Sequence, residues 1–336
     1  METEQRHRGR RGWRILGWVL LALFAAATVL PLVWPLGRTP EGVDPTELAG
    51  PASRFVDIDG VWYHYERAGE EECTVIFLHG FGASTFSWRD TLADASARCT
   101  AIAFDRPGFG LTERPLGEDI GDPNPYSQTT QAEHVIELMD ALGIEKAVLV
   151  GHSAGGTVAV LTAARHPERI IGLVLEAPAV LTGGGTPRLI RPILATPQAR
   201  RVGPAFVRRV FDGPRGERFL RSAWADPDAL TDEIIAGYRV PLEVRDWDRA
   251  LWELTIAPRP DDPAELLDLV TVPTLVVAGT EDTIVPYADS VRVAEILGAR
   301  FAPFEETGHI PHEERPDRFV NELYRFLDDL DDSGVL

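Results

Sequence analysis

The stretch Ala147-Val148-Leu149-Val150-Gly151-His152-Ser153-Ala154-Gly155 sets the fold of this chain. The short apolar run 147–150 leads into a turn with glycines on both sides of a serine, and a helix is predicted to follow at 157–165. A strand, a turn of this kind and a helix are the context of a Gly-x-Ser-x-Gly nucleophile elbow. The glycines allow a sharp turn that holds the Ser153 hydroxyl above the strand end, and the helix start directs the Ala154 amide toward a developing oxyanion.

Short apolar runs alternate with amphipathic helices on both sides of this stretch. Buried strands are predicted at 74–78, 100–104, 170–175, 274–278 and 301–304, a hairpin at 54–66, and helices at 133–142 and 318–328. This alternation is typical of an α/β fold, a parallel sheet covered by helices on both faces. Between residues 181 and 269 an arginine- and proline-rich stretch with several tryptophans interrupts it. We therefore expect a core of residues 54–180 and 270–330 with a helical cap inserted at 181–269.

A serine hydroxyl is a poor nucleophile without a base, which a histidine from elsewhere in the chain must provide. His309 follows the last predicted strand, where a loop can present an imidazole over the C-terminal edge of the sheet. His312, three residues further on, is the alternative base. The base in turn needs an acid to fix its tautomer.

Asp282 is the preferred acid, because the turn that begins at Gly279 after strand 274–278 should aim this side chain toward the sheet edge. Glu281 is its neighbour, and Glu176, one strand earlier, is the fallback. A second oxyanion amide should come from the loop His79-Gly80-Phe81-Gly82, whose glycines permit amides to converge, and Phe81 N–H is our choice.

At these residues the chain resembles the α/β-hydrolase superfamily, and the resemblance covers nearly everything from residue 54 to the C-terminal helix. It rests on His79-Gly80-Phe81-Gly82, Asp105-Arg106-Pro107-Gly108-Phe109-Gly110, Gly151-His152-Ser153-Ala154-Gly155-Gly156, and Gly308-His309 with Glu313 and Pro316 behind. The resemblance implies an eight-stranded, mostly parallel sheet with a cap after the sixth strand. It also implies hydrolysis through an acyl-enzyme, without metal or organic cofactor. The order Ser153, Asp282, His309 fits that architecture.

Similar members with an aspartate nucleophile open epoxides or displace halide, and Ser153 disfavours both activities. We expect a carboxylic ester, apolar or lipid-like, as the small-molecule substrate. The same triad also supports amide, thioester and carbon–carbon bond cleavage on this fold. A hydrolase-like protein that binds a ligand without turnover is the alternative from another class.

The first segment of the chain predicts the compartment. Residues 15–36 carry no charge and are long enough, at about 1.5 Å per residue, to cross a bilayer core of roughly 30 Å. The basic segment 1–14 precedes them and the linker 37–53 with its acidic side chains follows, so the positive-inside rule places the N-terminus in the cytoplasm. We expect a single-pass signal anchor with the catalytic domain outside the cell membrane. A signal peptide cleaved near residues 25–27, giving a secreted enzyme, is the alternative.

The charge and the cysteines exclude two classes of protein. With 33 basic against 52 acidic side chains, the net charge is -19, which argues against nucleic-acid binding because phosphates would be repelled. The two cysteines, Cys73 and Cys99, lack the spacing that a zinc site requires, so no structural metal is expected. If the strand order of the resembled family holds, both cysteines precede neighbouring parallel strands at the same level. In an oxidising compartment this arrangement predicts a disulfide.

The cap carries an unusual local charge. The stretch 188–221 holds nine arginines against Asp212 and Glu217, a sum of 9 - 2 = +7. Between them, apolar residues at 206–207 and 210–211 could form one face of a short basic helix. Such a helix is typical of a segment that lies on an anionic membrane surface. An ordinary cap helix with intramolecular ion pairs is the equal alternative.

Overall fold

One sheet of eight strands organises the chain, and the computed structural model describes residues 2–33, 41–182 and 185–336. The strands are β1 (Ser53–Ile58), β2 (Val61–Ala68), β3 (Thr74–Leu78), β4 (Thr100–Phe104), β5 (Ala147–His152), β6 (Ile170–Glu176), β7 (Thr274–Gly279) and β8 (Arg300–Phe304). Their order is β1-β2-β4-β3-β5-β6-β7-β8. The neighbours from β4 to β8 are parallel, whereas β2 is antiparallel to both β1 and β4. The predicted mostly parallel, eight-stranded sheet is therefore confirmed.

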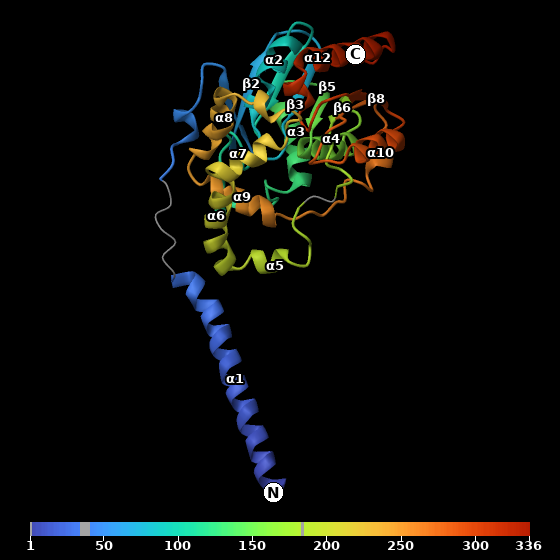
Figure 1. Cartoon of the computed structure of the whole chain (residues 1–336). Helices are drawn as coiled ribbons and strands as arrows, with labels where there is room; N and C mark the ends of the chain where they lie inside the picture. Colours follow the sequence, from blue (N-terminus) through green and yellow to red (C-terminus); the bar gives the residue numbers. More distant parts are fainter. Residues whose placement is uncertain (1, 34–40, 183–184) are drawn as a thin grey trace.

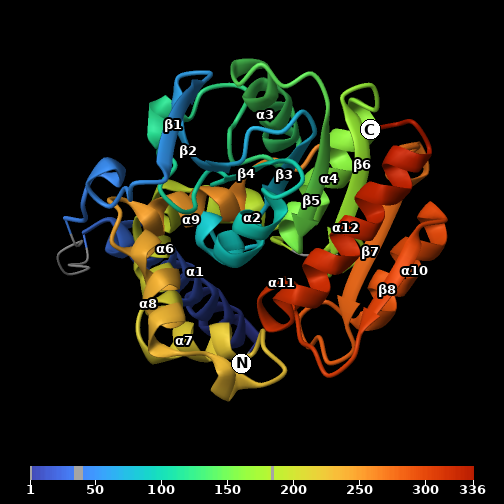
Figure 2. The same ribbon diagram turned by 90° about the horizontal axis from the view of Figure 1, so that it is seen from above.

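Helices cover both faces of this sheet (Figure 2). They are α2 (Arg89–Ala95), α3 (Gln128–Ala141), α4 (Ala154–Arg165), α10 (Tyr287–Leu297), α11 (Pro311–Glu314) and α12 (Pro316–Asp332). Side chains of α3, α4 and α10 share one apolar core with Ile76 and Leu78 of β3. Side chains of α2 and α12 share the other with Val75 and Phe77. Strands buried on both faces explain why the sequence shows continuous apolar runs instead of alternation.

The segment between β6 and β7 forms a layer of helices over the C-terminal ends of the strands. It contains α5 (Arg191–Leu194), α6 (Pro197–Phe211), α7 (Pro214–Arg221), α8 (Asp232–Arg239) and α9 (Trp247–Ile256). Arginines of α6 pair with carboxylates of α9, Arg200 with Glu253 and Arg208 with Asp248. Val207 of α6 is buried in an apolar cluster with α9, although its neighbour Phe206 is exposed. These ion pairs match the second of our two interpretations of the basic stretch, and its contact with a membrane remains a prediction.

The N-terminal helix α1 (Glu2–Val33) extends away from the rest of the chain (Figure 1). Our expectation of a membrane span at 15–36 is not supported: none of the helices in the described part of the chain combines the length and apolarity needed to cross a membrane. The end of α1 contacts the cap instead. Gln198 Nε2 of α6 donates to the Thr28 carbonyl over 3.2 Å, and Arg201 Nε donates to the Pro31 carbonyl over 3.1 Å. Residues 34–36 of the predicted span and residues 37–40 of the predicted linker lie outside the described residues.

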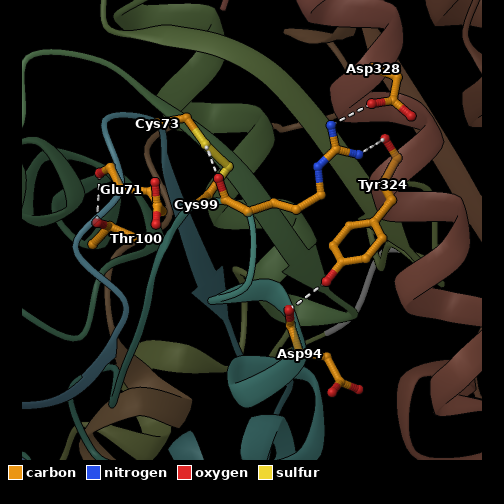
Figure 3. Close-up of a disulfide and its surroundings, with 8 residues drawn as sticks. Glu71, Cys73, Asp94, Cys99, Thr100, Tyr324 and Asp328 are labelled. Carbon is orange, nitrogen blue, oxygen red and sulfur yellow. Dashed lines mark hydrogen bonds and ion pairs between the residues drawn. A yellow bond between two sulfur atoms is a disulfide. The ribbon is translucent and has the colours of Figure 1, made fainter.

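The predicted disulfide is confirmed and ties two strands together at their starts (Figure 3). Cys73 and Cys99 have Cα atoms 4.8 Å apart, and the residues after them, Thr74 and Thr100, are partners in the parallel β3–β4 register. Arg98, next to Cys99 in the sequence, pairs with Asp328 of α12, which is labelled in Figure 3. The disulfide therefore lies at the opposite end of the strands from the Ser153 turn.

Candidate active site

Ser153 lies in a strained turn between β5 and α4. Its backbone has φ 51° and ψ -118°, an uncommon conformation for a residue with a side chain, and such outliers concentrate at functional sites. The turn is fixed because Ser153 N–H donates to the Glu176 carbonyl over 2.9 Å and the Ser153 carbonyl accepts from Ala179 N–H over 3.1 Å. Gly155 is required for close packing, since a Cβ there would lie 2.1 Å from the Leu78 carbonyl oxygen.

His309 and Asp282 form a buried hydrogen bond at the ends of β8 and β7. His309 Nδ1–H donates to Asp282 Oδ2 over 2.8 Å. The other carboxylate oxygen, Oδ1, accepts from the amides of Ile284 over 2.8 Å and Val285 over 2.9 Å. Three donors hold the carboxylate in one orientation. With Nδ1 donating, Nε2 of His309 carries the lone pair that a general base needs.

The loop that carries His309 is fastened to the cap. His309 N–H donates to the Ala223 carbonyl over 2.7 Å. The Glu314 carboxylate then joins the two parts, because Oε1 accepts from Gly308 N–H over 2.8 Å and Oε2 accepts from Ala225 N–H over 2.9 Å. Sequence reasoning quoted Glu313 behind His309 and missed Glu314. The position of Glu314 five residues after His309 could have marked it as a partner of this loop. The sequence does not show that it also binds an amide of the cap.

The two alternatives that we kept from the sequence pair with each other. His312 N–H and Nδ1–H each donate to the Glu176 carboxylate over 2.7 Å, and the His312 ring stacks on Trp88 with centroids 3.9 Å apart. His152 lies between the two histidines and donates from Nε2 to the His309 carbonyl over 2.9 Å. Burial, followed by the charges of His309 and His312, lowers the pKa of His152 well below its usual value. His152 is therefore a neutral donor that supports the His309 loop.

A cavity of about 220 Å³ lies between core and cap and brings the candidate residues together. Ser153, His309 and Phe81 all line it, and Asp282 lies behind His309. Most of the lining is apolar and comes from both layers, including Phe109, Phe211, Phe219, Leu220, Trp247 and Ile310. Ala154 lines a second cavity, which Ser153 and Phe81 share. Of the five residues that the sequence predicted for the site, four therefore line one or both of these cavities, and Asp282 is bonded to one of the four, His309.

Among the described residues, one group has the composition of a metal site, and it lies apart from this cavity. Ligand atoms of Asp59, His134 and Glu137 are within 4.8 Å of one another. His134 Nδ1 is hydrogen-bonded to the Tyr63 hydroxyl, and its Nε2 lies 3.8 Å from Glu137 Oε2. None of the three lines either cavity at Ser153, so this group takes no part in the chemistry considered below.

Comparisons with known proteins agree with this fold. The model of the alpha/beta hydrolase family matches residues 75–322. A 2-hydroxy-6-oxo-6-phenylhexa-2,4-dienoate hydrolase of Comamonas testosteroni is 29% identical over 307 residues, covering 84% of this chain and 99% of the relative. A meta-cleavage product hydrolase from Pseudomonas fluorescens is 28% identical with a TM-score of 0.65, covering 82% of this chain and 97% of that structure.

A second solved structure extends the similarity further along the chain. A bacterial membrane phospholipase A is 26% identical with a TM-score of 0.64, and the match covers 95% of this chain and 99% of that structure. The family match spans well over half of the residues, from β3 into α12, and the sheet has the strand order described above. This chain therefore belongs to the alpha/beta hydrolase family.

Proposed function

We propose that this hydrolase cleaves carboxylic esters through an acyl-enzyme on Ser153, with His309 as general base and Asp282 as its acid partner. One observation carries the proposal: Ser153, on a strained turn, and His309, bonded to a buried carboxylate, line the same largely apolar cavity. A nucleophile, a base and a group that orients the base are the three parts that this chemistry requires.

The reaction follows from these positions. Ser153 Oγ attacks the ester carbonyl carbon while its proton passes to His309 Nε2. The amides of Phe81 and Ala154 stabilise the negative oxygen of the tetrahedral intermediate. The intermediate collapses as His309 gives the proton to the leaving alcohol. Water then attacks the acyl-enzyme in the same way, which releases the carboxylic acid and restores Ser153.

The cavity lining supports an apolar acyl group. Aromatic and aliphatic side chains from core and cap surround Ser153, and burying them against an acyl chain is favourable by roughly 25 cal/mol per Å². The similarity to a membrane phospholipase A supports a lipid-like ester. The similarity to the dienoate and meta-cleavage product hydrolases supports a different substrate, and the experiment must separate the two.

A fluorophosphonate probe and a series of esters test the proposal. The wild-type protein should be labelled and should hydrolyse p-nitrophenyl esters with a clear preference among acyl lengths. Ser153→Ala should abolish labelling and reduce kcat on the order of a million-fold, whereas the exposed Ser333→Ala is the control and should change neither. A wild-type protein that cleaves 2-hydroxy-6-oxo-6-phenylhexa-2,4-dienoate but no ester would contradict the ester assignment. Absence of labelling would favour the ligand-binding alternative.

We further infer that the enzyme works outside the cytoplasm and in contact with a membrane. The disulfide between Cys73 and Cys99 supports an oxidising compartment, since such bonds are rare in the cytosol. Large apolar side chains are exposed along α1, which is typical of a segment that meets lipid: Trp13, Leu16, Trp18, Val19, Leu20, Leu21, Val29, Leu30, Leu32 and Val33.

Fractionation of cells that express the full chain tests this location. We expect the protein in the membrane fraction, and alkaline carbonate distinguishes an integral protein from one held at the surface. Protease added to intact cells should digest the hydrolase domain. Protection until the membrane is opened, together with two freely alkylated cysteines in the unreduced protein, would reverse the assignment.

A further inference from the structure

Ser153 opens onto two cavities of different character. The first is the largely apolar cavity described above. The second, of about 580 Å³, lies on the α4 side of the nucleophile, and its lining includes Ala154 and Thr157. Phe81, Phe109 and Ser153 line both cavities, so the two meet at the nucleophile. A substrate bound at Ser153 can therefore reach into both.

The charges that line the two cavities differ. The first cavity contains both signs, with Arg114, Arg239 and Glu217. Among the described residues that line the second cavity, the charged side chains are Arg106 and Arg259, and none is acidic. The whole chain has 52 acidic and 33 basic residues, so a cavity lined by two cations and no anion departs from the overall composition.

Arg106 is buried with part of its hydrogen-bonding capacity unused. Its Nε–H donates to the His79 carbonyl over 3.0 Å and its Nη1–H to Gln131 Oε1 over 2.9 Å. The remaining nitrogen, Nη2, is buried and has no hydrogen-bond partner among the described residues. A buried cation whose donors are not all satisfied costs free energy, which an anion would offset. Burial lowers the pKa of Arg106 to about 9, so the group is still charged near neutral pH.

Arg259 adds a second positive charge to the same lining. Burial, followed by the charge of Arg191, lowers the pKa of Arg259, so its environment is both partly desolvated and positive. A guanidinium presents a planar fork of donors that matches the two oxygens of a carboxylate. The cavity that reaches Ser153 is thus lined by two guanidinium groups, and Arg106 contributes its Nη2, which has no hydrogen-bond partner among the described residues.

We propose that the second cavity binds a carboxylate carried by the substrate, while its apolar part occupies the first cavity. This inference rests on the proposed ester hydrolysis and narrows it to esters with an acidic group on one side of the scissile bond. The carboxylate takes no part in the chemical step. It fixes the orientation of the ester over Ser153.

Matched esters of the full-length protein test the idea. On the acyl side, p-nitrophenyl hexanoate is compared with the mono-p-nitrophenyl ester of adipic acid. On the alcohol side, the hexanoate of 4-hydroxybenzoate is compared with that of 4-hydroxybenzamide. We expect kcat/KM to be higher for the charged member of one pair by about tenfold or more, the effect of one charge-assisted hydrogen bond. Equal rates within both pairs, or a preference for the neutral member in both, would overturn the inference.

Variants then locate the effect. Arg259→Gln should remove most of the preference by raising KM for the charged ester, with the neutral ester changed by less than about twofold, and Arg259→Lys should retain part of it. Arg209→Gln, on the exposed face of α6, is the matched control. Equal loss on charged and neutral esters in Arg259→Gln would indicate a structural role and contradict the inference.

Competition separates the anions. Adipate should inhibit hydrolysis of the neutral ester more strongly than inorganic phosphate, and the reverse order would contradict a carboxylate site. If no ester is hydrolysed and the probe does not label Ser153, the proposed function itself fails. If neutral esters are hydrolysed without any preference for charge, only the present inference fails.

Discussion

The histidines of two histidine–carboxylate pairs lie three residues apart, His309 in a loop and His312 in α11, and the pairs differ in what surrounds them. His309 with Asp282 and His312 with Glu176 have nearly equal hydrogen bonds, 2.8 Å and 2.7 Å between nitrogen and oxygen. The His309 ring lines the cavity at Ser153. The His312 ring is fully buried, is stacked on Trp88, and lines neither cavity at Ser153.

A histidine held by a carboxylate is therefore not sufficient to identify a base. The pair with His312 joins the start of α11 to the end of β6, because both the backbone amide and the ring of His312 bind Glu176. The pair with His309 leaves a ring nitrogen for the substrate. Access to the nucleophile separates a catalytic role from a structural one, and the following experiments test that separation.

Replacing each histidine should give the largest difference. We expect His309→Ala to reduce kcat for ester hydrolysis by at least about ten-thousandfold, since removal of the base leaves only the oxyanion amides and binding. His312→Ala should lower stability while the folded fraction keeps kcat within about tenfold. Kinetics normalised to the folded fraction, measured by circular dichroism, give kcat, and denaturant titration gives the stability. Full activity in His309→Ala with loss in His312→Ala would exchange the two roles.

The carboxylates should follow the same division. Asp282→Asn keeps the shape of the side chain but no longer fixes the His309 tautomer, and kcat should fall by about ten-thousandfold. Glu176→Gln should leave kcat within about tenfold, because Glu176 contacts Ser153 only through its backbone carbonyl. Steady-state kinetics on one ester compare the two variants directly. A larger loss of kcat in Glu176→Gln than in Asp282→Asn would refute the comparison.

Unfolding should reveal the structural pair. Glu176→Leu removes the acceptor of two buried N–H groups, so we expect the free energy of unfolding to fall by about 3 kcal/mol. Denaturant titration measures this change. Asp282→Leu is the matched variant, and it also leaves N–H donors without an acceptor. An equal loss of unfolding free energy in the two variants would mean that both pairs stabilise the fold to the same extent.

We expect the smallest effect from replacing His79, which is not paired with a carboxylate. The effect is a change in how stability depends on pH. Burial, followed by the charge of Arg106, lowers the pKa of His79 to about 3. Between that value and the pKa of about 6.5 in the unfolded chain, only the unfolded state binds the proton. The contribution of His79 to the free energy of unfolding is therefore fully present above about pH 6.5. Below that pH it falls by about 1.4 kcal/mol per pH unit. His79→Gln should reduce this slope in denaturant titrations at pH 7 and pH 5, and an unchanged slope would assign it to other groups.

Much of the site could be predicted from the sequence because its residues follow strands. Ser153, Asp282 and His309 each come after a buried apolar run, and parallel strands bring their ends to one edge. The choice between His309 and His312 was less secure, since three residues of spacing cannot show which ring meets a cavity. The second cavity was missed, because its lining comes from segments far apart and Arg106 had been noted only as part of a motif.

The cap shows what local composition cannot reveal. We counted a charge of +7 in the stretch 188–221, and the partners that neutralise Arg200 and Arg208 lie on α9, beyond that stretch. Counting charges along a window cannot include partners 40 or 53 residues away. The N-terminal helix also has contacts that its own sequence does not reveal. An uncharged run predicted a span, but its end contacts α6, which no pattern within the run reveals.

The attachment of the His309 loop to the cap limits how the enzyme can open during a catalytic cycle. Ala223 binds the His309 amide directly, and Glu314 links Ala225 to Gly308. A cap that swung away as one rigid body would pull on the base and disturb its alignment with Ser153. Opening of the cap and catalysis are therefore coupled at this segment. Substrate entry and product release that keep His309 in place must use cap helices that are not bonded to its loop. The cap segment 223–225 stays in place while those helices move.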